Sequence, residues 1–134
     1  MKNFQLPLCL ALLFFSCALF NPEDEKQHDE RLAGTWDCLE WGDGGEYSYA
    51  FEETMYLLTM KSESGIAVRI ENGEWYTQSD QIFFNGTVTE CSPCSKTPPY
   101  STVPTIPYLF AGDTLKMQWG VHSDGSWDTF TKRQ

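Results

Sequence analysis

Basic residues are scarce in this sequence. Nine lysines and arginines stand against nineteen aspartates and glutamates, and the formal net charge is −10. Nucleic acid needs a basic footprint that neutralises its phosphates, so this balance excludes nucleic acid as a partner. An anionic lipid surface would be repelled in the same way, so any attachment to a membrane must come from a hydrophobic segment or an attached lipid.

Long hydrophobic runs are also missing, with one exception near the N-terminus. Residues 4–20 are mostly apolar, but Gln5 and Pro7 interrupt them. A transmembrane helix needs about 20 consecutive apolar residues, so a stable membrane span is not expected here. The positive N-terminal region, the apolar stretch of ordinary secretory length and the small residues after it are typical of a signal peptide.

The end of this run, LFFSC, resembles a bacterial lipobox, in which a small residue precedes a cysteine that is acylated and becomes the new N-terminus. Ser16 and Cys17 occupy these two positions, and Phe14 stands where a leucine is usual. The resemblance implies that residues 1–16 are removed and that Cys17 is lipidated. Cleavage after Ala18, which would give a secreted protein, and an uncleaved anchor are the alternatives.

Cysteine is scarce beyond the signal peptide, where Cys38, Cys91 and Cys94 remain. Export places them in an oxidising compartment, so we predict one structural disulfide. The candidate pairs are Cys38 with Cys91, Cys38 with Cys94, and a local ring within CSPC. A redox site of the thioredoxin kind is not expected, because proline-rich chain rather than a helix follows the motif. A zinc site would lack a fourth ligand unless His122 supplied it, so no metal is expected.

Histidine is almost absent from the folded part, which disfavours an enzyme. His122 is followed by Ser123 and Asp124, but adjacent residues in a turn do not converge into a nucleophile, a base and an orienting group. Asp124 and Asp128 lack the ligand spacing of a calcium loop. We therefore predict no catalytic activity and no cofactor, and His28, in an acidic stretch, is assigned no role.

No helical periodicity follows the signal peptide, and the period is two instead. Each of three stretches places its large apolar residues on one face: Tyr47, Tyr49 and Phe51; Ile66, Val68 and Ile70; Leu115, Met117 and Trp119. Turn signals rich in glycine, serine and aspartate separate the apolar runs. The pattern predicts an all-β fold, a single antiparallel up-and-down β-barrel of about eight to nine strands, because closure removes exposed edges.

The chain divides into two parts after the signal peptide. Residues 17–31 are acidic and lack aromatics beyond the cleavage region, so we expect a lipidated cysteine followed by a solvated tether. Residues 32–134 suffice for one core and therefore for one domain. Within it, residues 90–107 hold five of the seven prolines. Because proline cannot donate to a β-ladder, this segment is predicted to lie outside the sheet as a flap.

The stretch LAGTWDC resembles the start of the lipocalin-like superfamily, whose first strand carries a Gly-x-Trp motif at Gly34 and Trp36. The resemblance continues through NGEWYTQSDQIFF, AGDTLKMQW and DTFTKR, as in small bacterial lipocalin-like domains that follow a lipobox. It implies that Trp36 closes one end of the barrel and that a basic residue of the last strand, Arg133 or Lys132, lies across its ring. A cation over an indole contributes about 0.5–2 kcal/mol.

The resemblance also implies that a small, largely apolar molecule binds inside the barrel. The candidate ligand-binding residues are those predicted to point inward: Tyr47, Tyr49, Phe51, Val68, Ile70, Phe84, Met117 and Trp119. An eight-stranded barrel is just wide enough either to hold one ligand or to be filled by its own side chains. The alternative is therefore a filled barrel that binds a basic protein partner, in the manner of lysozyme inhibitors or adhesion modules.

The residue after Cys17 bears on the destination of the lipoprotein. It is Ala18 rather than the aspartate that retains lipoproteins at the inner membrane. We therefore expect a monomer anchored by its acyl chains to the outer membrane, on the periplasmic or the surface face, with secretion as the alternative.

Overall fold

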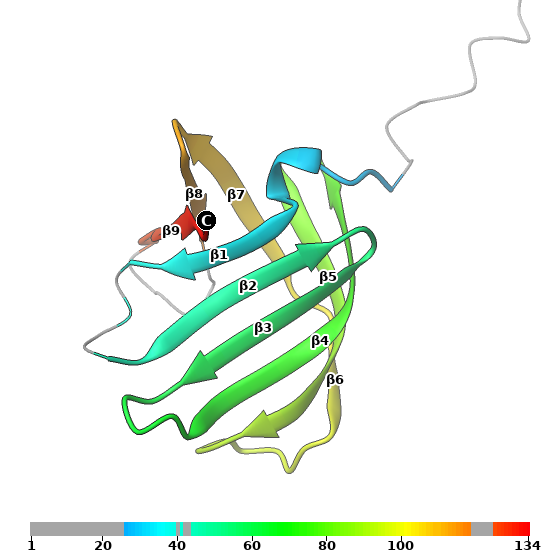
Figure 1. Cartoon of the computed structure of the whole chain (residues 1–134). Coiled ribbons are helices and arrows are strands. Elements are labelled where there is room, and N and C mark those ends of the chain that lie inside the picture. The colour runs from blue at the N-terminus through cyan, green and yellow to red at the C-terminus, as the bar shows by residue number, and fades with distance from the viewer. Residues whose placement is uncertain (1–25, 40, 42–43, 119–124) are drawn as a thin grey trace, which may run out of the picture.

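The structure is a computed structural model that describes residues 26–39, 41, 44–118 and 125–134. In these ranges the chain is almost entirely β-structure, folded into an antiparallel barrel (Figure 1). The strands are β1 (Gly34–Cys38), β2 (Glu46–Glu52), β3 (Met55–Lys61), β4 (Ala67–Gln78), β5 (Gln81–Cys91), β6 (Tyr100–Thr102), β7 (Thr105–Ala111), β8 (Thr114–Met117) and β9 (Asp128–Lys132). The predicted fold class is confirmed.

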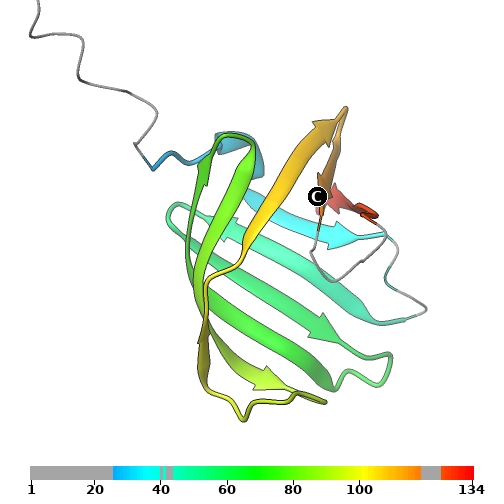
Figure 2. The same ribbon diagram turned by 180° about the vertical axis from the view of Figure 1, so that it is seen from behind.

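Eight of these strands close the barrel and one is additional. Sequence neighbours pair from β1 to β5 and from β7 to β9, β5 pairs with β7, and β9 returns to β1. The other edge of β5 is shared, because β7 pairs with its first residues and the short β6 with residues 86–88 (Figure 2). The meander therefore needs no long crossover connection.

The strand β2 follows the predicted alternation. Tyr47, Tyr49 and Phe51 are buried in the barrel interior, and Leu115 and Met117 of β8 are buried as well. The core residues that the structure describes all lie between Leu32 and Phe130, within the fragment 21–134. None of the helices in the described ranges is long and apolar enough to cross a membrane.

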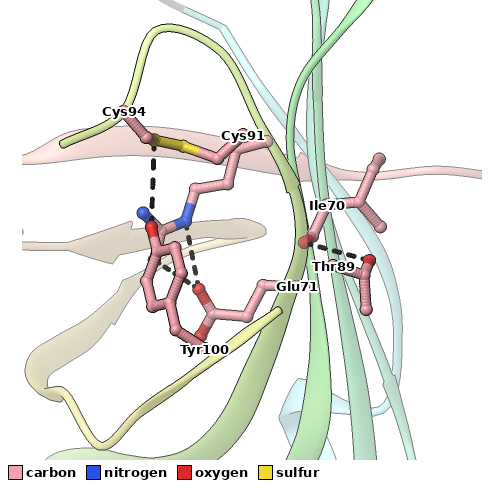
Figure 3. The surroundings of a disulfide bond; sticks show 7 residues. Ile70, Glu71, Thr89, Cys91, Cys94 and Tyr100 are labelled. Carbon is pink, nitrogen blue, oxygen red and sulfur yellow. Dashed lines mark hydrogen bonds and ion pairs between the residues drawn. A yellow bond between two sulfur atoms is a disulfide. The ribbon is translucent and has the colours of Figure 1, made fainter. Parts of the chain in front are cut away.

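The prediction of which face of β4 is buried is wrong at Ile70 and Glu71. Glu71 is 1% exposed and opposes the buried Leu58 of β3, whereas Ile70 is half-buried on the opposite side of the strand (Figure 3). A register irregularity between Ile70 and Glu71 marks the place. The polar face turns inward here because Arg69 pairs with Glu71, and this ion pair makes burial of the carboxylate tolerable.

The proline-rich segment 90–107 lies only partly outside the sheet, so its prediction as a flap is wrong for its second half. Residues 100–102 form β6, and residues 105–107 begin β7. Its prolines take part as acceptors: the Phe84 amide donates to the Pro104 carbonyl at 3.0 Å, and the Gln118 amide to the Pro107 carbonyl at 3.0 Å. A proline lacks an N–H but keeps its carbonyl, which is enough for these positions.

Residues 26–33, which include the described part of the predicted tether, contact the barrel and are called the strap. Gln27 forms a β-bridge with Thr77 of β4. His28, for which the sequence predicts no role, packs edge-on against Trp75, with ring centroids 4.9 Å apart. The strap then enters η2 (Glu30–Leu32), which buries Leu32 completely. The acidic composition predicted a solvated tether, but specific contacts of Gln27, His28 and Leu32 hold residues 26–33 against the barrel.

Candidate functional site

The barrel interior, where the ligand-binding residues were predicted, is an assembly of contacting aromatic rings. Tyr49 lies at its centre, and its ring centroid is 5.7 Å from Phe51, 5.7 Å from Phe84 and 5.8 Å from Phe130. Phe51 and Phe84 are themselves 6.2 Å apart. These separations lie in the range of direct aromatic packing, so the rings contact one another across the barrel.

The remaining ligand-binding candidates are distributed differently. Tyr47 and Met117 are buried in the same core, with the Tyr47 ring 5.2 Å from Phe130. Val68 and Ile70 are half-buried and are not part of that core. Trp119 lies outside the described residues. The structure therefore brings together five of the aromatic and sulfur-containing candidates as mutual packing partners.

The predicted closing motif lies beneath the strap. Gly34 has a φ of +114°, which favours glycine, and Trp36 donates from its indole nitrogen to the Leu32 carbonyl at 2.8 Å. Of the two basic candidates, Lys132 lies over the Trp36 ring, with its Nζ 5.5 Å from the ring centroid. Arg133 instead forms an ion pair with Asp37, so its predicted place in the motif is wrong. Lys132 is the last residue of β9, and Arg133 follows the strand and pairs with Asp37 of β1.

A row of small residues opens space for one tyrosine inside the barrel. Tyr56 of β3 opposes Gly73 of β4, which opposes Gly86 of β5. A Cβ atom on Gly86 would overlap the Tyr56 hydroxyl, and one on Gly73 would overlap the backbone of residues 85 and 86. The two glycines are therefore needed for the Tyr56 side chain to lie across β4 and β5.

The Tyr56 hydroxyl reaches the buried carboxylate of Glu71. It donates to Oε1 at 2.5 Å, and the Thr102 hydroxyl of β6 donates to the same oxygen at 2.8 Å. Arg69 donates to Oε2 from Nε at 3.1 Å and from Nη2 at 2.6 Å. Both carboxylate oxygens thus accept hydrogen bonds, from donors on three different strands.

Burial and the Glu71 charge act together on the pKa values of the surrounding groups. Desolvation raises the pKa of Tyr56 far above its ordinary value, and the hydrogen bond to Glu71 raises it further. Desolvation lowers the pKa of Arg69, but its hydrogen bonds to Glu71 outweigh this and the net pKa is raised. Tyr56 therefore remains a neutral donor and Arg69 a cation throughout the physiological range.

The Glu71 cluster borders the only disulfide-distance pair among the described residues, Cys91 and Cys94 (Figure 3). This is the local ring within CSPC, and Cys38 is not part of it. The Tyr100 hydroxyl contacts the Cys94 sulfur at 3.8 Å, and Lys96 lies over the Tyr100 ring. The disulfide and the Tyr100 contacts therefore hold residues 91–100 beside Arg69 and Glu71.

The Glu71 cluster, which consists of Tyr56, Arg69, Glu71 and Thr102, is a structural cross-link between strands. Tyr56, Arg69 and Thr102 each donate hydrogen bonds to Glu71, so the side chain joins β3, β4 and β6. The predicted turn residues His122, Ser123 and Asp124 lie outside the described residues. Within the described ranges, no group of three or more histidine, cysteine or acidic side chains is placed to hold a metal ion.

Sequence reasoning missed the cluster because Glu71 and Arg69 occupy the nominally polar positions of an alternating strand. One signal was available: Gly73 and Gly86 both lie in strand interiors, where glycine marks a close approach of another group. We found no match to this chain among protein-family models, curated proteins or solved structures.

Proposed function

We propose that this protein is a lipid-anchored interaction module of the cell envelope, a barrel with a filled core that binds a basic protein partner through its outer surface. One observation carries the proposal: the side chains predicted to line a ligand cavity pack on one another, with Tyr49 in contact with Phe51, Phe84 and Phe130. An interior occupied by its own rings supports recognition on the outside rather than in the lumen.

The charge of the chain indicates the kind of partner. A formal net charge of −10 on a chain of this size produces a negative field that attracts cationic proteins and speeds their encounter. The Glu71 cluster supports the proposal indirectly, because it cross-links β3, β4 and β6 and keeps the barrel surface rigid. A rigid surface loses less conformational entropy when a partner binds.

Binding to lysozyme, a basic envelope-directed protein, provides a direct test. Residues 21–134 are immobilised, and binding of lysozyme is compared with binding of an acidic protein of similar mass at low and high salt. The proposal expects saturable, salt-weakened binding of a cationic protein and none of the acidic one. Equal binding of both, or a panel of basic envelope proteins that all fail to bind, contradicts it.

The anchor is proposed from the resemblance of LFFSC to a lipobox, with Cys17 as the acylated residue. In a bacterial host, the full chain should partition into the detergent phase, and Cys17→Ala should leave a water-soluble or uncleaved form. Cys9→Ala is a matched control, because it removes a cysteine from the same export segment and should partition as the parent does. Unchanged partitioning of Cys17→Ala contradicts the anchor.

A further inference from the structure

The outer face of the barrel carries an exposed apolar pair at the start of β3. Met55 is 46% exposed and Leu57 is 42% exposed, and two residues of separation put both side chains on the same face of the strand. The half-buried Ala50 opposes Leu57 on β2. Strands β2, β3 and β4 lie side by side around this face (Figure 1).

Acidic residues flank this pair on both sides. Glu52 of β2 and Glu74 of β4 are the direct cross-strand neighbours of Met55, so the three form one row. Directly opposed side chains lie about 5 Å apart, which places the two carboxylates roughly 10 Å from each other across the row. Glu53, in the adjoining turn, adds a third exposed carboxylate.

The ion pairs of the described residues do not include these three carboxylates, which belong to Glu52, Glu53 and Glu74. At the opposite end of the same two strands, by contrast, Glu46 pairs with Lys61 at 3.6 Å. The first end of β3 therefore presents negative charge that a partner can neutralise.

The backbone that carries this face is fixed before any partner arrives. The β2–β3 turn is tied to β4, because the Trp75 amide donates to the Thr54 carbonyl at 3.0 Å and the Trp75 indole to the Glu52 carbonyl at 3.4 Å. Trp75 itself is buried in the core. The positions of the carboxylates and the apolar pair are thus set by the barrel.

From this arrangement we infer that the surface formed by Glu52, Glu53, Met55, Leu57 and Glu74 is the docking site for the basic partner. This inference rests on the proposed function. The matching segment has an apolar side chain between basic side chains, so that the apolar group covers Met55 and Leu57 while the cations meet the flanking carboxylates. A second copy of this chain would bring the same negative charges together, and an anionic lipid surface would be repelled in the same way.

The test uses nitrogen-15-labelled residues 21–134 and amide chemical shifts. The probe is the peptide Lys-Lys-Ser-Leu-Ser-Lys-Lys, and its analogue with serine in place of leucine measures the apolar contribution. We expect saturable shifts concentrated in residues 50–58 and 72–76, with weaker binding of the serine analogue. Shifts centred elsewhere, or no saturable shifts, overturn the docking site.

Surface variants separate the docking site from the proposed function. Glu52→Gln with Glu74→Gln should weaken peptide and lysozyme binding about five-fold or more, and Leu57→Ser should weaken both. Leu109→Ser is a matched control because Leu109 is also 42% exposed, and Glu63→Gln is the control for an exposed carboxylate beyond the other end of β3. If lysozyme binds and the variants bind it unchanged, this site is wrong and the function stands; if no basic partner binds, both fail.

Discussion

At the scale of single residues, the most demanding feature is a carboxylate buried in an aromatic core. Glu71 is 1% exposed and is held by Tyr56, Thr102 and Arg69. Removing one donor from such a group leaves the buried charge less well solvated in a medium of low polarity, which costs more than the hydrogen bond itself gains on folding. The cluster therefore makes each of its donors important for stability.

Tyr56→Phe should lower the free energy of unfolding by about 1.5–3 kcal/mol, the range for a buried hydrogen bond to a charged group. Urea denaturation followed by tryptophan fluorescence measures it. Tyr76→Phe serves as the control, because Tyr76 is half-buried on the outer face and stacks on Phe83, and it should change stability by less than about 0.5 kcal/mol. Equal effects of the two variants would show that the Tyr56 hydroxyl does not stabilise the fold.

At the scale of elements, the strap of residues 26–33 is attached to the barrel partly by hydrogen bonds to the carboxylate of Asp29. Its Asp29 accepts from the Arg31 side chain and from the Tyr108 hydroxyl, at 2.6 and 2.9 Å. The hydrogen bond from Arg31 lowers the pKa of Asp29, against the opposing effect of desolvation. Burial, followed by the bond to Asp29, raises the pKa of Tyr108 to about 12.

The lowered pKa of Asp29 predicts how the stability that the strap contributes depends on pH. The lowered pKa of Asp29 means that its contribution is present above about pH 4 and is lost as the pH falls through the folded-state pKa. Asp29→Asn keeps the capping oxygen but removes the charge, so it should cost about 1 kcal/mol near neutral pH, and this difference should shrink in acid. Glu30→Gln, a neighbouring exposed carboxylate, is the control; an acid-independent Asp29→Asn effect would contradict the account.

The disulfide ring is the second element with a measurable contribution. Cys91 and Cys94 close a loop with a sequence separation of 3, for which loop-closure entropy predicts a stabilisation of about 2 kcal/mol. Reduction should therefore lower the free energy of unfolding of the parent by that amount. Cys38→Ser should keep the response to reductant, whereas Cys94→Ser should lose it. A response that disappears in Cys38→Ser would mean that Cys38 belongs to the bridge.

Sequence patterns predicted some elements well because a single strong constraint governs them. The strand β2 alternates large aromatics with small or polar residues, so the aromatic face is the one that packs into the core. In β4, Ile70 and Glu71 compete for the interior, and the outcome depends on Arg69, Tyr56 and Thr102, which no local pattern reveals. Composition likewise could not show that Gln27 and Asp29 find partners on β4 and β7.

At the scale of the whole molecule, the barrel combines an interior of contacting rings with an acidic exterior. The interior gives a rigid body, because aromatic packing and the Glu71 cluster tie strands together from within. The exterior would supply the long-range attraction for the cationic partner that we propose. The lipid anchor proposed at Cys17 would hold this body at a membrane surface, where such partners are encountered.

Native mass spectrometry of residues 21–134, purified without detergent from a bacterial host, distinguishes a filled core with recognition on the outside from a core that holds a ligand. We expect the bare mass of the polypeptide with its disulfide, on a protein whose circular dichroism and cooperative melting show that it is folded. A co-purifying small molecule of definite mass, released on denaturation, would contradict this expectation and would make Tyr47, Tyr49, Phe51 and Phe84 the lining of a ligand site.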